Sequence, residues 1–105
     1  MMIERHWKGL AKPEKAQQYV DHLQNDTFKR LKKLDGFISA RILKRIVAEG
    51  VEFLIVTEWE TPDAIRQFAG KDFDRAVVPD FVQNLMIRYD ECVYHYEVSF
   101  TANSD

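Results

Sequence analysis

The chain has 105 residues, of which 46% are hydrophobic and 30% are charged, and its formal net charge is −2. This length and composition predict one soluble globular domain over residues 1–105. The slightly negative charge lacks the basic excess that DNA or RNA binding requires, so we expect no nucleic-acid partner. The single cysteine excludes an intrachain disulfide, and no apolar run is long enough to span a membrane. We therefore expect a cytoplasmic protein that has no membrane partner.

Residues 2–11 are predicted to form the first strand, in which Ile3, Arg5 and Trp7 share one face. A helix is expected to begin near Pro13, because proline suits the first helical turn. Its apolar stripe is formed by side chains at helical spacing, namely Ala16, Tyr19, Val20, Leu23, Leu31 and Leu34.

Poor helix formers at positions 25–27 interrupt this stripe. A break there, with Asp26 or Thr27 as a new cap, is compatible with the pattern. The basic run at 29–33 is interpreted as a solvated helix end, because cations are favoured near the negative end of the helix dipole.

The central segment is the most informative part of the chain, because it changes from strand to helix periodicity at one point. Strands are predicted over residues 37–47 and 51–60, joined by a hairpin loop in which Gly50 can adopt a positive φ. Thr61 is a candidate N-cap for a helix over residues 62–69, with proline in its first turn. Gly70 is suited to end that helix.

The last third of the chain is predicted to contain short helical turns over residues 72–76 and 80–85, separated by Pro79, and a final strand over 91–100. Residues 101–105 form a frayed polar tail. The resulting order, β-α-β-β-α-β, predicts an α+β fold with a four-stranded antiparallel sheet of the ferredoxin-like type. Its helices cover one sheet face, and we expect a second copy of the chain to cover the other, giving a homodimer.

Several sequence blocks resemble the antibiotic biosynthesis monooxygenase superfamily of dimeric α/β barrels, in particular its small bacterial monooxygenase-like branch. The blocks are residues 4–9 (Glu-Arg-His-Trp-Lys-Gly), 51–59 (Val-Glu-Phe-Leu-Ile-Val-Thr-Glu-Trp), 64–70 (Ala-Ile-Arg-Gln-Phe-Ala-Gly), 75–79 (Arg-Ala-Val-Val-Pro) and 95–98 (His-Tyr-Glu-Val). The resemblance implies dimerisation through the sheet face into an α/β barrel.

The resemblance also implies a cofactor-independent monooxygenase acting on a small aromatic or quinol-type substrate. Such chemistry needs a base in an apolar pocket that excludes water, and His6 and His95 are the candidate catalytic bases. The candidate substrate-binding wall is aromatic and consists of Trp7, Trp59, Phe68, Tyr94 and Tyr96. The competing interpretation is a non-catalytic dimeric module that binds a small apolar ligand or serves in assembly, with structural histidines and core aromatics.

Two other chemistries fit the chain poorly. Haem-degrading members of the superfamily use an asparagine, a tryptophan and a histidine at positions that align with His6, Phe68 and Val78, and all three differ here. The histidines at positions 6, 22 and 95 lie on separate elements without paired ligand spacing, so we expect no metal site.

Overall fold

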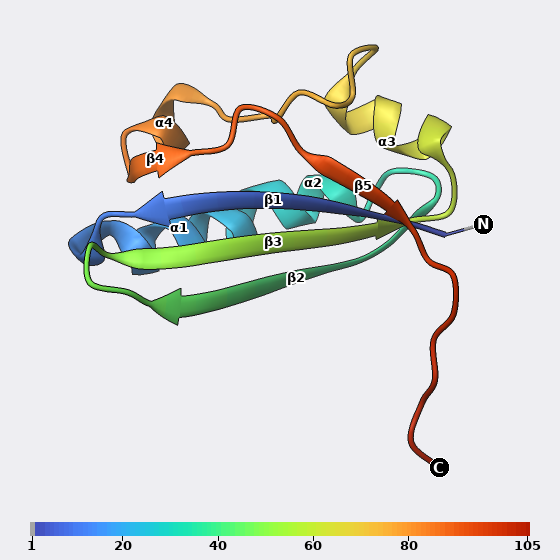
Figure 1. Cartoon of the computed structure of the whole chain (residues 1–105). Helices are drawn as coiled ribbons and strands as arrows, with labels where there is room; N and C mark the ends of the chain where they lie inside the picture. Colours follow the sequence, from blue (N-terminus) through green and yellow to red (C-terminus); the bar gives the residue numbers. More distant parts are fainter. Residues whose placement is uncertain (1) are drawn as a thin grey trace.

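The computed structural model describes residues 2–105 and has an antiparallel sheet with helices packed against one face (Figure 1). The five strands are β1 (Ile3–Ala11), β2 (Phe37–Ile46), β3 (Val51–Trp59), β4 (Met86–Tyr89) and β5 (Tyr94–Glu97). Their order is β2-β3-β1-β4, and β5 also pairs with β1. This arrangement confirms the predicted α+β, ferredoxin-like fold.

The C-terminal strand differs from its prediction. Of the strand predicted over residues 91–100 only β5 forms, and β4, which was not predicted, precedes it; both pair with β1 on the same side. β4 pairs with the end of β1 near Gly9, whereas β5 pairs with its beginning, near Arg5. Residues 98–105 follow β5 without regular structure and run away from the sheet (Figure 1).

The helical segment after β1 continues without a break through the position where the sequence pattern was interrupted. It comprises η1 (Pro13–Lys15), α1 (Ala16–His22), the π-helical turn η2 (Leu23–Thr27) and α2 (Phe28–Leu31). The backbone N–H of Phe28 donates to the carbonyl of Leu23, which is the wider hydrogen bond of a π turn. The poor helix formers are therefore accommodated by widening one turn, and Asp26 and Thr27 are not caps.

The helix after β3 matches the prediction. α3 (Pro62–Ala69) begins at Thr61, whose hydroxyl accepts a hydrogen bond from the backbone N–H of Ala64 at 3.1 Å. It ends at Gly70, which has φ of 81°. The short helix α4 (Asp80–Gln83) follows Pro79, as predicted.

Residues 72–76 form one hydrogen-bonded turn but no helix: the backbone N–H of Arg75 donates to the carbonyl of Asp72 at 3.2 Å. Distant partners also hold this backbone: Val93 donates to the carbonyl of Asp74, and Ala76 donates to the carbonyl of Glu91, each at 2.8 Å. Arg75 also forms an isolated bridge with Cys92, which is exposed. These bonds fasten the segment to residues 91–93, so the groups that they use are not free to extend the turn into a helix.

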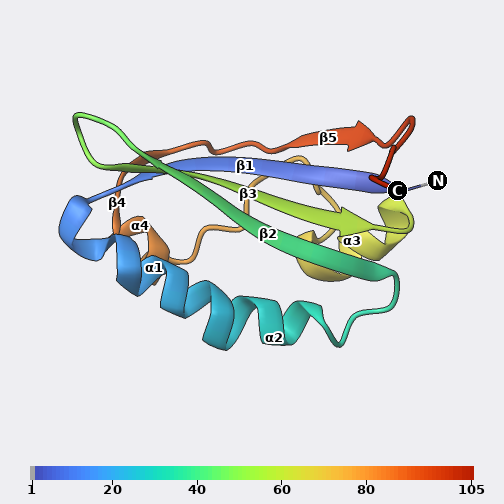
Figure 2. The same ribbon diagram turned by 90° about the horizontal axis from the view of Figure 1, so that it is seen from below.

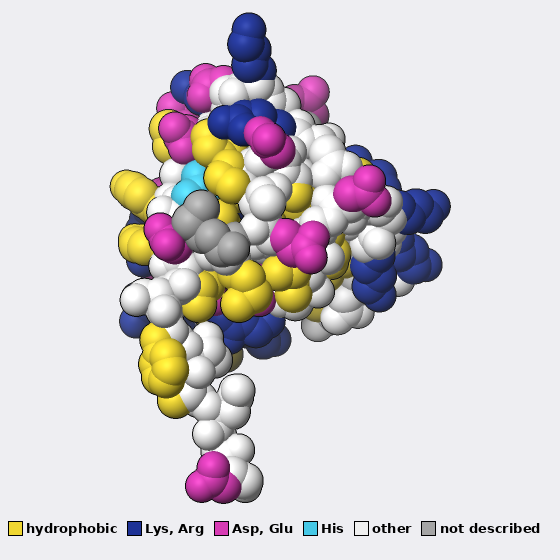
Figure 3. Space-filling model, turned by 90° about the vertical axis from the view of Figure 1, so that its right-hand side faces the viewer, with side chains coloured by type: hydrophobic (Ala, Val, Ile, Leu, Met, Phe, Trp, Pro, Cys, Tyr) yellow, Lys and Arg dark blue, Asp and Glu magenta, His cyan; other side chains and the backbone are white. Residues whose placement is uncertain are grey.

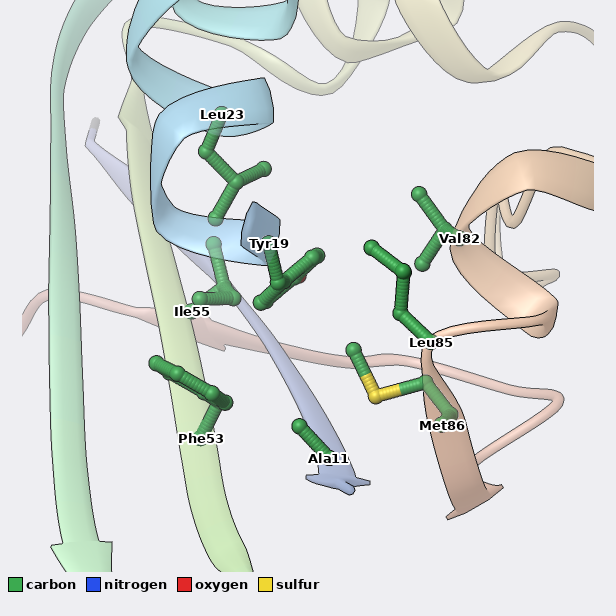
Figure 4. Close-up of a cluster of buried hydrophobic side chains, with 8 residues drawn as sticks. All are labelled: Ala11, Tyr19, Leu23, Phe53, Ile55, Val82, Leu85 and Met86. Carbon is green, nitrogen blue, oxygen red and sulfur yellow. The ribbon is translucent and has the colours of Figure 1, made fainter. Parts of the chain in front are cut away.

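The core lies between the sheet and the helices and has two parts. The first contains aromatic and aliphatic side chains that point inward from the long helical segment, from β3 and from residues 82–86 (Figure 4), namely Tyr19, Leu23, Phe53, Ile55, Val82, Leu85 and Met86 together with Ala11 of β1. The second surrounds Trp59, whose side chain is fully buried, with Leu31 and Ile65. Strand alternation places Arg5 and Thr57 on this inner face as well.

The opposite face of the sheet has no helix in front of it (Figure 2). It presents Leu43, Tyr94 and Tyr96 among charged side chains, and Arg45 pairs there with Glu52. At the hairpin, Gly50 is required for close approach rather than for a positive φ, because a Cβ would lie 2.3 Å from the carbonyl oxygen of Ala11.

Lysine and arginine side chains gather along one flank of the molecule (Figure 3), and the run at 29–33 is exposed at four of its five positions. No helix within residues 2–105 is long and apolar enough to cross a membrane.

Candidate functional site

A cavity of about 90 Å³ lies between the inner face of the sheet and the helices. β1 contributes Arg5 and Trp7, β3 contributes Thr57, and the long helical segment contributes Tyr19 and His22. Phe68 of α3 closes one side. At about 10–15 Å³ per water molecule, the volume corresponds to roughly six to nine waters, which is the size of one substituted aromatic ring.

Arg5 is the charged side chain that lies deepest in this site, with only 5% of its surface exposed. Its Nη1 donates to the carbonyl of Phe73 and to Nε2 of His95, the latter at 3.0 Å. Its Nη2 donates to the carbonyl of Arg75 at 3.0 Å. Burial lowers the pKa of Arg5 to about 10, partly offset by the charge of Asp74, so the guanidinium is still protonated at neutral pH.

His95 lies behind Arg5 and does not line the cavity. Because arginine can only donate, Nε2 of His95 must accept, and the ring proton is placed on Nδ1, 3.3 Å from Oδ1 of Asp74. Burial lowers the pKa of His95, and the charge of Arg5 lowers it further against the opposing effect of Asp74. Phe73 stacks on the imidazole at 4.6 Å. The ring is therefore held neutral and fixed in orientation.

The apolar wall of the cavity includes two of the five aromatic residues predicted for substrate binding, Trp7 and Phe68. Trp59 lies one layer behind, where its ring stacks on Phe68 at 6.5 Å. Its indole N–H donates to the hydroxyl of Thr57 at 2.8 Å, which orients a polar group on the cavity wall. Burial raises the pKa of Tyr19, so this phenol is neutral at ordinary pH.

His22 is the histidine that lines the cavity. It is the last residue of α1, and its side chain is 15% exposed. Its Nε2 lies 3.4 Å from the hydroxyl of Thr27, and its Nδ1 lies 3.9 Å from a carboxylate oxygen of Asp26. The intervening π turn brings His22 and Thr27 to the same wall of the cavity, and π turns are frequent at functional sites.

The other predicted residues lie on the open face of the sheet, away from the cavity. His6 is hydrogen bonded to Glu4 at 2.9 Å, and its ring contacts that of Tyr96 at 5.0 Å. Tyr94 and Tyr96 are 64% and 55% exposed. Residues 5 and 6 of one strand point to opposite faces, and so do 94 and 95. The structure therefore separates His6 from His95 and does not bring the two predicted bases to one site.

Sequence analysis did not identify Arg5, His22 and Thr57 as candidate site residues. Arg5 had a usable signal, since a cation between Ile3 and Trp7 at strand spacing must lie on the buried face. His22 and Thr57 gave weaker signals, because their positions depend on the π turn and on packing between distant elements. No group of three or more metal-ligating side chains is found in the described part of the chain.

A family model described as "Antibiotic biosynthesis monooxygenase" matches residues 2–77. A monooxygenase-like protein of this type from Bacillus cereus has 17% identity and a TM-score of 0.72, covering 100% of this chain and 98% of its own. A monooxygenase of Streptomyces coelicolor, solved with nanaomycin D, has 13% identity and a TM-score of 0.68, covering 99% and 92%. A haem-degrading protein of Mycobacterium tuberculosis has 16% identity and a TM-score of 0.61, covering 98% of each.

At these identities the likeness shows a common fold only. Among curated proteins, no sequence matches this chain significantly.

Proposed function

Because this chain belongs to the antibiotic biosynthesis monooxygenase family, we propose that it oxidises a small aromatic or quinol-type substrate with molecular oxygen, without a bound cofactor. The observation that carries the proposal is the cavity itself. It is walled by Trp7 and Phe68 and contains a buried guanidinium. An apolar cavity with a few convergent polar groups is the usual form of a small-molecule site. The nanaomycin D complex of a structural neighbour supports an aromatic ligand by analogy of fold.

The chemistry begins with loss of a phenolic proton. The resulting phenolate transfers one electron to oxygen, and the radical pair combines to form a carbon–oxygen bond. The base returns its proton to the resulting peroxide anion, giving a hydroperoxide. Loss of water, with the hydrogen on the same carbon, leaves a carbonyl, so one oxygen atom enters the product and the other leaves in water. The protein must remove the proton, stabilise the anion and exclude bulk water.

We assign the base role to His22, because it is the histidine on the cavity wall and histidine is the commonest general base. His95 acts through Arg5 as a positioning residue, since its Nε2 is occupied by the guanidinium. His6 is a candidate base only for a reaction on the open face of the sheet, where Tyr94 and Tyr96 lie near it.

The test is oxygen consumption with a panel of monocyclic and bicyclic hydroquinones. His22→Ala should lower kcat/KM by about 100-fold or more, the typical contribution of a general base. Gln18→Ala, at an exposed position of the same helix, should leave kcat/KM unchanged. If His6→Ala lowers kcat/KM and His22→Ala does not, the reaction takes place on the open face of the sheet.

The alternative is a dimeric module that binds a small ligand without turnover. One observation favours it: both predicted bases, His6 and His95, are already hydrogen bonded within the chain, and neither lines the cavity. Ligand binding by the wild-type protein without oxygen consumption across the panel would select this alternative.

We also propose that the chain forms a homodimer through the open face of the sheet. That face exposes Leu43, Tyr94 and Tyr96, and it carries charges of both signs, so that one copy can complement another. A domain of this size buries a limited share of its own apolar surface, which favours covering such a face.

Sedimentation velocity at micromolar concentration should show a species of twice the chain mass. Leu43→Lys should shift it toward the monomer, because a desolvated ammonium is costly in an interface. Phe81→Lys, a matched change on the helix side, should leave the dimer intact. A wild-type monomer at this concentration would refute the proposal.

A further inference from the structure

We propose that the cavity selects aromatic ligands that carry a single negative charge on oxygen, and that Arg5 binds this anionic oxygen. The inference rests on the proposed function, because it names the ligand class of the same cavity. It concerns binding rather than turnover, and the two can be tested separately.

The first observation is that Arg5 has no carboxylate partner among residues 2–105. Its acceptors are the carbonyls of Phe73 and Arg75 and the neutral imidazole of His95. The nearest compensating carboxylate, Asp74, is bonded to the far side of that imidazole. The buried cation is therefore held by neutral groups, and its charge is only partly balanced.

The second observation concerns the donors of Arg5 that are still free. A guanidinium has five N–H groups, and the identified bonds use three of them, two on Nη1 and one on Nη2. No buried side-chain nitrogen or oxygen in the described residues lacks a partner. Nε of Arg5 has no identified bond, so its N–H is accessible rather than sealed in the core, and the accessible space next to Arg5 is the cavity that it lines.

The third observation is the charge of the lining. The permanently charged side chains there are Arg5 and Arg30, and no described lining residue is Asp or Glu. Arg30 lies 3.4 Å from a carboxylate oxygen of Asp26 outside the lining, so Arg5 is the cation without a carboxylate partner. In a region of low dielectric, an unbalanced cation is costly, and a ligand anion would offset that cost. The lining therefore favours an anion over a neutral molecule of the same shape.

The aromatic part of the ligand follows from the walls. Trp7, Phe28 and Phe68 supply flat apolar surfaces, and the Arg5 guanidinium carbon lies 5.9 Å from the centre of the Phe68 ring. A ring against Phe68 would place a directly attached oxygen within reach of the same guanidinium. A phenolate has this geometry and is also the reactive form in the proposed oxidation, and an aromatic carboxylate places its charged oxygens one carbon further from the ring.

A purely structural role for Arg5 predicts the same internal contacts, since it ties residues 73 and 75 to β1. The two roles differ in the ligand preference that they produce. A structural tie gives no preference between charged and neutral ligands of equal shape, whereas an anion site gives a strong one.

Isothermal titration of the wild-type protein with benzoate and with benzamide measures this preference directly. Both probes resist oxidation by oxygen, so the result does not depend on turnover. We expect benzoate to bind about tenfold more tightly or better, as a charge-assisted hydrogen bond requires. Equal affinity, or no detectable binding of benzoate, would overturn the inference.

Substitution then assigns the preference to Arg5. Arg5→Gln should bring the affinities for benzoate and benzamide close together, and Arg5→Lys should retain part of the preference. Lys33→Gln removes an equal charge at an exposed position outside the cavity and should change neither. If Arg5→Gln does not fold, Arg5→Lys and the wild-type probe pair still decide the question. An undiminished preference in a folded Arg5→Gln protein would refute the assignment.

The oxygen-consumption assay is independent of the comparison between benzoate and benzamide binding. Selective binding of benzoate without activity on any hydroquinone would retain the anion site and reject the monooxygenase. Activity on hydroquinones with no preference for benzoate over benzamide would retain the monooxygenase and reject the anion site.

Discussion

Trp59→Ala should lower the free energy of unfolding by about 3–5 kcal/mol, the usual cost of removing a large aromatic side chain from a core. Trp59 has no exposed surface and packs against Phe37 and Phe68. Alanine would leave a void between β3 and α3, and the hydroxyl of Thr57 would lose the donor that now orients it. The loss is a large part of the roughly 5–15 kcal/mol that stabilises a typical domain.

Urea unfolding followed by circular dichroism measures this loss. Ile46→Ala is the control, because Ile46 lies at the end of β2 with 85% of its surface exposed and should change stability by less than about 0.5 kcal/mol. The stability loss of Trp59→Phe should fall between those of Trp59→Ala and Ile46→Ala, because phenylalanine keeps an aromatic ring in the core but loses the N–H bond to Thr57. A Trp59→Ala protein as stable as the Ile46→Ala protein would contradict the assignment of Trp59 to the core.

The elements predicted correctly are those whose signals are local. The strand before Thr61 and the helix after it were identified from periodicity and from a cap, and the structure shows both the cap bond and the glycine that ends the helix. The order of the elements followed, and with it the fold. Each of these features depends on residues within one turn or one strand of each other.

The errors occur where distant groups decide the conformation. Residues 72–76 have a helical composition, but Val93 and Glu91 supply their backbone partners from the last part of the chain. The strand predicted over residues 91–100 is limited to β5, and β4 was missed, because each of these short strands is set by its pairing with a different end of β1. The π turn satisfies the backbone without the break that composition suggested. A single sequence contains no direct record of such pairings.

The site was predicted in part for the same reason. Trp7 and Phe68 do line the cavity, whereas the pairing of Arg5 with His95 depends on a register between the first and last strands. The difference between residues 5 and 6 was available in advance, since strand alternation alone sends them to opposite faces. His6 was predicted as a base because of its imidazole, although strand alternation places its neighbour Arg5, and not His6, on the buried face.

Arg5→Met should lower the free energy of unfolding by at least about 3 kcal/mol, at about 1–3 kcal/mol for each of the three acceptors that lose their donor. Methionine fills much of the same volume, so the loss reports mainly on the carbonyls of Phe73 and Arg75 and on His95. Arg5→Lys should cost less, because it can still donate to one or two of them. Lys33→Met, at an exposed position, should change stability by less than about 0.5 kcal/mol.

Hydrogen exchange distinguishes the source of this loss. The amides of Ala76 and Val93 fasten residues 72–76 to the last part of the chain, and they should exchange faster in Arg5→Met if the guanidinium holds that segment in place. Unchanged stability would contradict the prediction, and it would mean that the fold tolerates an apolar residue here, as some proteins do when a buried charge is replaced. A buried cation that the fold does not need would then be explained by the ligand it binds. Stability and benzoate preference, measured on the same variants, therefore separate what Arg5 does for the fold from what it does for the cavity.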